Sequence, residues 1–155
     1  MAKEIERKFL VVNDSFKRLC HTALSISQGY ITTDKKAVVR VRTCNDRGFL
    51  TIKGENSGAV RDEWEYPIPV DDASEMISKL AGNTIIKKTR YLVDFGGFRW
   101  EIDEFHSPAA GLIVAEIELP DSNTEFPLPP FIGEEVTGNP AYYNSSIAAA
   151  GKLNS

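Results

Sequence analysis

The first predicted strand contains Glu4-Ile5-Glu6-Arg7-Lys8-Phe9. Alternate side chains of a β-strand point to opposite faces. Glu4, Glu6 and Lys8 therefore share one face, and Ile5 and Phe9 share the other. This division into an ionisable face and an apolar face decides the predicted fold, because it recurs along most of the chain.

Further runs rich in β-branched and aromatic residues follow, separated by turn signals such as Gly96-Gly97. They predict strands over Glu4–Val11, Ser27–Thr33, Ala37–Thr43, Phe49–Lys53, Arg61–Ile68, Ile85–Asp94, Phe98–Phe105 and Leu112–Leu119. This spacing is typical of an antiparallel meander that closes into a barrel or folds into a sandwich.

Three helices and one long loop complete the expected organisation. The helices are predicted over Asp14–Thr22, over Asp71–Leu80 with Asp71 or Asp72 as the N-cap, and over Tyr142–Ala150, ending before Gly151. Pro120–Pro130 is predicted to be a loop. Glu134-Glu135 either begins a cover together with the last helix or simply joins a strand to it.

The same parity rule gives every predicted strand but Ser27–Thr33 an ionisable face. Its basic members are Lys8, Arg40, Arg42, Lys53, Arg61, Lys88 and Arg90. Its acidic members are Glu4, Glu6, Glu63, Glu65, Glu101, Asp103, Glu116 and Glu118. One such strand alone would favour the solvated outer face of a sandwich. Seven strands with almost only ionisable residues at alternate positions favour a face that binds a ligand.

If this face is inside a barrel, neither charge set can be buried without partners. A polyanion bound by the basic residues and divalent cations bound by the acidic residues would satisfy both sets. Oxygen ligands alone suit Mg²⁺ or Mn²⁺ better than zinc. The apolar face would then point outward and require cover from the helices.

Composition excludes several other classes of protein. The 155 residues are enough for a single domain over residues 1–155, and no apolar run approaches the roughly 20 residues of a membrane span. A net charge of −4 argues against a nucleic-acid partner, and two cysteines without a CxxC pair argue against a thiolate zinc site. The start, Met1-Ala2-Lys3-Glu4-Ile5-Glu6, has acidic residues where a signal peptide would have its apolar core, so we expect a cytoplasmic protein.

An ordered set of motifs resembles the CYTH superfamily, the triphosphate tunnel metalloenzymes. The set is Glu4-Ile5-Glu6-Arg7-Lys8, Gln28-Gly29-Tyr30, Arg40-Val41-Arg42, Thr51-Ile52-Lys53, Glu63-Trp64-Glu65, Lys88-Thr89-Arg90-Tyr91, Glu101-Ile102-Asp103, Glu116-Ile117-Glu118 and Glu134-Glu135-Val136-Thr137. The likeness covers nearly the whole chain and is greatest to the short bacterial members, several of which hydrolyse inorganic triphosphate. It implies a mainly β fold (α+β): an eight-stranded antiparallel barrel, open at both ends, with a charged interior and helices packed outside.

The resemblance also implies roles for matching positions. Glu4, Glu6, Glu116 and Glu118 resemble the metal-binding acids, and Glu101 and Asp103 are expected to serve a metal directly or through water. Lys8, Arg40, Arg42, Lys53 and Arg90 resemble the phosphate-binding residues, to which the charged face adds Arg61. Lys88 matches a lysine thought to assist hydrolysis.

We therefore predict hydrolysis of a terminal phosphoanhydride bond with Mg²⁺ or Mn²⁺, most directly inorganic triphosphate to pyrophosphate and phosphate. A second metal or a carboxylate would orient the attacking water, and Lys88, Glu63 and Glu65 are the candidate catalytic residues. Adenylate cyclisation, hydrolysis of thiamine or nucleoside triphosphates, and polyphosphate binding without turnover are the alternatives. The expected partner is the small-molecule triphosphate, without nucleic acid or membrane, for a monomer or a homodimer.

Overall fold

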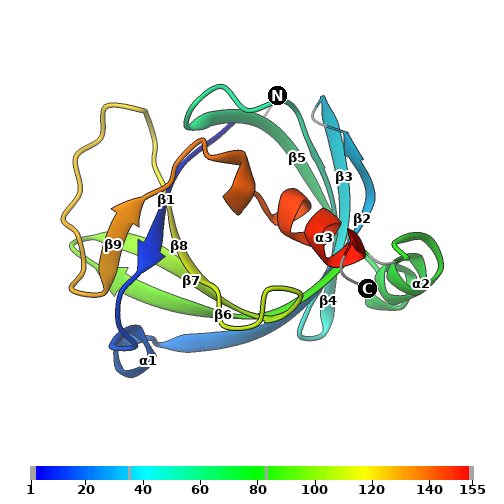
Figure 1. Ribbon diagram of the computed structural model, residues 1–155, viewed down its shortest axis with the longest axis horizontal. Coiled ribbons are helices and arrows are strands. Elements are labelled where there is room, and N and C mark those ends of the chain that lie inside the picture. Colours follow the sequence, from blue (N-terminus) through cyan, green and yellow to red (C-terminus); the bar gives the residue numbers. More distant parts are fainter. Residues whose placement is uncertain (1–2, 35, 83, 154–155) are drawn as a thin grey trace.

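The computed structural model describes residues 3–34, 36–82 and 84–153. Within these ranges the chain forms nine strands, three α-helices and a short 3-10 helix (Figure 1). The strands are β1 (Lys3–Val11), β2 (Thr22–Asp34), β3 (Ala37–Cys44), β4 (Arg47–Lys53), β5 (Val60–Ile68), β6 (Ile85–Phe95), β7 (Phe98–Ser107), β8 (Ile113–Glu118) and β9 (Ile132–Glu135). The helices are α1 (Phe16–Leu19), α2 (Val70–Leu80) and α3 (Asn144–Leu153), with the 3-10 helix η1 over Pro140–Tyr142.

Strand β1 closes the sheet into a barrel. The strand order is β5-β4-β3-β2-β6-β7-β8-β1-β9, and the first residues of β1 pair in addition with β5. Lys3 lies opposite Asp62 of β5, whereas Glu6 lies opposite Glu118 of β8. The predicted closed, eight-stranded antiparallel barrel is therefore confirmed. The ninth strand, β9, was not predicted; it pairs with β1 from Phe9 onward, beyond the stretch that β5 covers.

The outward face of the barrel is apolar and covered, as the parity of the strands predicts. Trp100, Ile102 and Ile117 are buried there with Phe16 of α1 and Phe131 of the loop before β9. On another side, α2 covers β3 by packing Ala73 and Ile77 against Val41. These two clusters place α1 and α2 outside the barrel, where their apolar surface is removed from water.

The C-terminal helix has a different place: Figure 1 shows η1 and α3, in orange and red, running across the ring of strands. Ile147 and Ala148 of α3 are buried in a cluster with Tyr30, Val38, Ile86, Phe105 and Val114. Four of these barrel residues have the parity of the charged face of their strands, and Tyr30 lies opposite the inward-pointing Arg40, so all five point inward. The inward positions thus change from charged to apolar along β3, β6, β7 and β8, and α3 packs on the apolar end.

Several element boundaries differ from the predictions for local reasons. The helix predicted over Asp14–Thr22 is wrong in extent, because Cys20 is already extended (φ −71°, ψ 145°) and β2 begins at Thr22. The predicted N-cap of α2 is wrong: Pro69 occupies that position, and Asp71 and Asp72 lie in the first turn, where their charges favour the helix dipole. The last helix begins at Asn144, after η1, and continues past Gly151. Among the described residues, no helix has the length and apolar character needed to cross a bilayer.

We predict that Gly29 is required by the close packing of α2 on β2. A Cβ at this position would lie 2.5 Å from the Cβ of Ala81 and 3.4 Å from Cγ2 of Ile77. Gly29→Val should lower the free energy of unfolding by about 1–3 kcal/mol in urea denaturation, because the packed helix must move. Gly54→Ala is the control, since its Cβ would lie 3.6 Å from the nearest atom, in Asp62. Equal losses for the two variants would contradict this explanation.

Candidate functional site: a charged cavity inside the barrel

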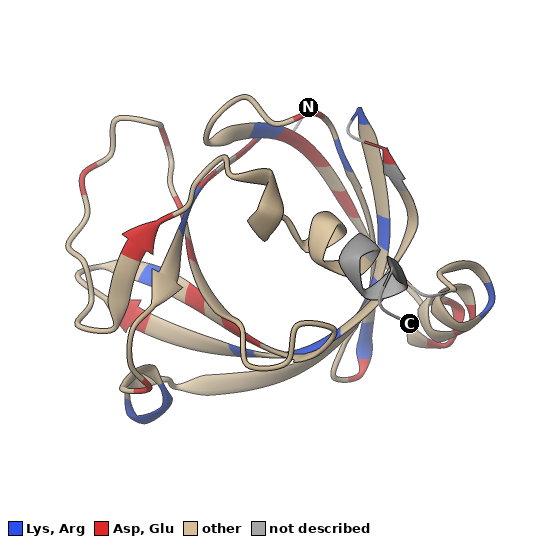
Figure 2. Ribbon diagram, viewed as in Figure 1, with Lys and Arg blue, Asp and Glu red and all other residues tan. Residues whose placement is uncertain are grey.

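The interior of the barrel holds a cavity of about 420 Å³. Figure 2 shows acidic and basic positions interspersed along the strands that surround it. Its basic lining consists of Lys3, Lys8, Arg40, Arg42, Lys53, Arg61 and Arg90, and its acidic lining of Glu4, Glu6, Glu63, Glu65, Glu101, Glu116 and Glu118. Of the predicted ionisable face, only Lys88 and Asp103 are missing from this lining. The charged face therefore lies inside the barrel and is not the solvated surface of a sandwich.

Two neighbouring arginines of β3 form a strongly positive part of the wall. Glu65 of β5 forms ion pairs with both, at 3.6 Å from Nη2 of Arg40 and 3.4 Å from Nη2 of Arg42, and it accepts a hydrogen bond from Thr51 at 2.9 Å. The buried Nε atoms of both arginines have no hydrogen-bond partner among the described residues. Burial, together with the charges of Arg40 and Arg90, lowers the pKa of Arg42 to about 10. One carboxylate thus leaves this cationic region short of negative charge.

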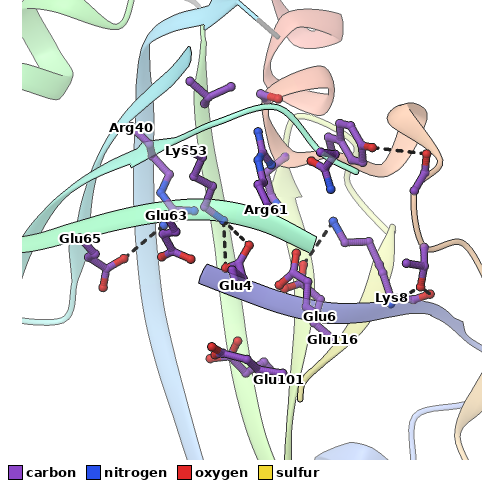
Figure 3. Close-up of a pocket in the computed structure, with 18 of the residues that line it drawn as sticks. Glu4, Glu6, Lys8, Arg40, Lys53, Arg61, Glu63, Glu65, Glu101 and Glu116 are labelled. Atoms are coloured by element: carbon purple, nitrogen blue, oxygen red, sulfur yellow. Dashed lines mark hydrogen bonds and ion pairs between the residues drawn. The ribbon is translucent and has the colours of Figure 1, made fainter. Parts of the chain in front are cut away.

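Two of the lysines in the wall each pair with a carboxylate from a strand that is distant in sequence (Figure 3). Nζ of Lys53 lies 3.2 Å from Oε1 of Glu4, and Nζ of Lys8 lies 3.3 Å from Oε1 of Glu116. Lys8 also donates to the backbone oxygen of Tyr142 at 3.0 Å. Burial alone would raise the pKa of Glu116, but the charges of Lys8 and Arg90 and a hydrogen bond to Glu6 together outweigh burial and lower that pKa to about 2. Each pair joins elements that are far apart in sequence.

The remaining carboxylates are crowded together. Burial, and then the charges of Glu116 and Glu4, raise the pKa of Glu6 well above its ordinary value. Burial and a hydrogen bond to Glu4 raise the pKa of Glu63 to about 8. Burial and the charges of Glu4 and Glu101 also raise the pKa of Glu118. These groups are short of positive charge, which a bound cation would supply.

The donor chemistry of this acidic region fits a hard divalent cation, because every donor is a carboxylate oxygen. The geometry is not that of a preformed centre: among the described residues, no three Asp, Glu, His or Cys side chains are placed to hold a metal ion. Binding would therefore require rotation of the glutamate side chains. The charges support a cation site, and the ligand set stays a prediction.

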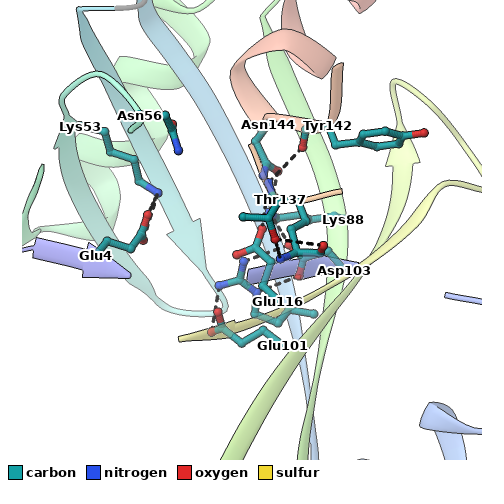
Figure 4. Close-up of polar contacts among 12 residues, drawn as sticks. Glu4, Lys53, Asn56, Lys88, Glu101, Asp103, Glu116, Thr137, Tyr142 and Asn144 are labelled. Carbon is teal, nitrogen blue, oxygen red and sulfur yellow. Dashed lines mark hydrogen bonds and ion pairs between the residues drawn. The ribbon is translucent and has the colours of Figure 1, made fainter. Parts of the chain in front are cut away.

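Lys88 and Asp103 lie behind the wall of the cavity, with 2% and 3% of their surfaces exposed (Figure 4). Asp103 accepts from Nζ of Lys88 at 2.7 Å and from Nε and Nη2 of Arg90 at 2.8 and 2.9 Å. Although burial opposes this effect, Arg90 and Lys88 hold the pKa of Asp103 well below its ordinary value. Burial lowers the pKa of Lys88 to about 8. Only Arg90 of this group reaches the cavity.

The C-terminal segment supplies lining residues that were not predicted as site residues: Thr137, Gly138, Tyr143, Asn144 and Ser145. The ring of Tyr143 lies 5.8 Å from Nζ of Lys8 and 5.8 Å from Cζ of Arg61. Tyr30 and Asn56 also line the cavity. The switch of inward positions to apolar residues at Val38 and Ile86 is the sequence signal that something must cover this end.

Comparison with known proteins agrees with this fold. The chain belongs to the CYTH domain family, whose model matches residues 2–147. It is 50% identical over 147 residues to an inorganic triphosphatase of Acetivibrio thermocellus, covering 95% of this chain and 94% of the relative. It is 36% identical over 151 residues to an inorganic triphosphatase of Nitrosomonas europaea, covering 94% and 96%. A solved inorganic triphosphatase superposes with a TM-score of 0.67 at 31% identity, over 96% of this chain and 95% of that one.

We predict that the metal-free protein loses stability as the pH rises from about 5 to about 8. In this window Glu63 ionises in the unfolded chain near its ordinary pKa of 4.5 but stays protonated in the fold up to about 8. The unfolded state therefore binds fewer protons than the folded state, and stability falls with pH. Glu6 and Glu118 act in the same direction. Glu116, whose pKa is lowered to about 2, makes stability rise with pH, but only below about pH 4.5, which is outside this window.

The measurement is the Tm in EDTA across this range. Glu63→Gln should flatten the decline, because the group no longer titrates. Glu104→Gln is the matched control, since Glu104 lies on the outer side of β7, where it accepts from Tyr91 and Lys17. A decline of the same slope in wild type and Glu63→Gln would count against the crowded acidic region as its cause.

Proposed function

We propose that this chain is a cytoplasmic triphosphatase that uses Mg²⁺ or Mn²⁺ to hydrolyse inorganic triphosphate to pyrophosphate and phosphate. The observation that carries the proposal is the cationic region of the cavity, where Arg40 and Arg42 share the single carboxylate of Glu65 and their buried Nε atoms have no partner among the described residues. A bound polyanion would supply the missing negative charge and accept from the unpaired Nε atoms. The names of two relatives, both inorganic triphosphatases, support the same substrate.

The wall suggests a division of roles among the side chains. The proposed phosphate-binding residues are Lys8, Arg40, Arg42, Lys53, Arg61 and Arg90, all of which line the cavity. Their charges would hold the phosphate chain in place and stabilise charge that develops on its oxygens. Phosphoryl transfer depends mainly on such positioning and neutralisation.

The proposed metal-binding acids are Glu4, Glu6, Glu116 and Glu118, with Glu101 beside them on the same side of the cavity. A divalent cation bound there would neutralise phosphate oxygens and favour the charged transition state. Lys53 and Lys8, which are paired with Glu4 and Glu116, connect this acidic region to the phosphate-binding region. The substrate and the cation would thus replace part of the present ion pairing.

Glu63 is hydrogen-bonded to Glu4, one of the proposed metal-binding acids, and could orient the attacking water once a bound cation lowers its raised pKa and ionises it. Glu65 has another task in the present arrangement, since it holds Arg40 and Arg42 together. Lys88 has no contact with the cavity, and a direct role for it in hydrolysis stays a prediction.

The expected metal dependence can be tested by phosphate release from inorganic triphosphate. Activity should vanish in EDTA and return with Mg²⁺ or Mn²⁺. Glu6→Gln should lower kcat/KM by about 100-fold or more and raise the metal concentration needed for half activity, because a proposed metal ligand is lost. Glu104→Gln makes the same chemical change outside the cavity and should leave both values near wild type. Full activity in EDTA would exclude this mechanism.

The expected substrate preference is inorganic triphosphate over ATP and thiamine triphosphate. The lining is dominated by charged groups, and strong discrimination normally needs hydrogen bonds to the group that is selected. The test compares kcat/KM for the three substrates under one metal and pH, with cyclic AMP measured beside them. An ATP preference of about tenfold, about 1.4 kcal/mol in transition-state binding, would favour a nucleotide enzyme. Cyclic AMP as the main product would favour a cyclase.

A further inference from the structure

Asp103, which is buried behind the cavity wall, accepts hydrogen bonds from Lys88 and Arg90. Asp103 uses both carboxylate oxygens: Oδ1 accepts from Arg90, and Oδ2 accepts from Arg90 and Lys88. The aspartate and the lysine are almost completely buried, and Arg90 alone of the three lines the cavity. A paired, bidentate carboxylate fixes the plane of a guanidinium group. Asp103 therefore fixes the guanidinium plane of Arg90, and Glu101, which accepts from Nη1 at 3.2 Å, is its second acidic partner.

Lys88 is also hydrogen-bonded to a residue of α3, which is not part of the barrel sheet. Its Nζ donates to Oδ1 of Asn144, at 2.9 Å, in the first turn of α3. The same amide oxygen lies 3.5 Å from Nε2 of Gln28, which is itself buried. Because an ammonium group only donates, its contact fixes which end of the Asn144 amide faces it. Asn144 thus connects the C-terminal helix to Lys88.

We propose that Asn144, Lys88 and Asp103 form a positioning unit that orients Arg90 for binding phosphate, and that Asp103 is not a metal ligand. The inference rests on the proposed function, because it assigns Arg90 to the phosphate-binding residues. Ligating a cation through Asp103 would require breaking its contacts to Arg90 and Lys88; Arg90 would keep only Glu101, and the buried Lys88 would lose its ion-pair partner. The crowded glutamates across the cavity have no such commitment to two basic groups.

The main test measures the Kd of tripolyphosphate in EDTA by calorimetry, beside KM and the Mg²⁺ concentration for half activity. Asn144→Ala should weaken tripolyphosphate binding about five- to tenfold and raise KM similarly, because Lys88 loses one acceptor. The half-activating Mg²⁺ concentration should stay at the wild-type value, whereas Glu6→Gln should raise it. Asp103→Asn should weaken tripolyphosphate binding further, also without a change in the metal requirement. If Asp103→Asn does not fold, Asn144→Ala still decides the matter.

Two comparisons separate this role from general support of the C-terminal segment. Asn139→Ala removes the cap of η1, where Asn139 accepts from the backbone N–H of Ala141, and contacts none of these charges; it should bind tripolyphosphate like wild type. In an Arg90→Gln background, Asn144→Ala should cause no further loss, because the residue acts through Arg90.

Equal losses in Asn139→Ala and Asn144→Ala, an additive loss in the Arg90→Gln background, or a changed Mg²⁺ requirement in Asp103→Asn would each overturn the inference. So would unchanged binding by Asn144→Ala in a protein whose wild type is active. A wild type that neither binds nor hydrolyses tripolyphosphate would overturn the proposed function, and the positioning role would fall with it.

Discussion

The structure depends on the neutralisation of charges inside a closed barrel. Two ionised groups removed from water are costly unless each has a partner, and one residue left unpaired costs more than the pair contributes. The interior meets this requirement with contacts between strands that are distant in sequence, such as Lys8 with Glu116 and Lys53 with Glu4. The barrel must close in one register for these partners to meet, and β1 is the strand that sets that register against both β8 and β5.

Neutralisation of the interior charges is incomplete, and the charges that lack a full set of partners are not spread evenly over the cavity wall. Arg40 and Arg42 share one carboxylate, while Glu6 and Glu63 crowd against other acids. A fold selected only for stability would gain little from such a cavity, since well-packed apolar side chains are often at least as stable as buried ion pairs. The apolar core instead lies on the outer face, around Trp100, Ile102 and Ile117. Stability and ligand binding are therefore assigned to opposite faces of the same strands.

The C-terminal segment contributes both to the apolar packing and to the charged cavity. Ile147 and Ala148 cover the apolar end of the interior, which would otherwise be exposed to water. Tyr143 and Asn144, a few residues earlier, reach the charged region. Packing of the helix and orientation of the charged groups are thus coupled through one short stretch of chain. The last helix is therefore part of the cavity and not only an outer cover.

Alternation by itself determined which face of each strand is charged, because the period of a strand is two and needs no tertiary information. It identified nearly all the charged lining, from Glu4 to Glu118, although parity alone allowed an outer surface as well as an interior. Closure of the barrel decided that question, since it depends on pairing between β1 and β5, which are far apart in sequence. Parity also could not distinguish Arg90, at the cavity, from Lys88 and Asp103, behind it, because depth along a tilted strand is set by its neighbours. The contact between Asn144 and Lys88 could not be predicted from the sequence either. It follows from how α3 packs across the ring, and the two residues are 56 positions apart in the chain.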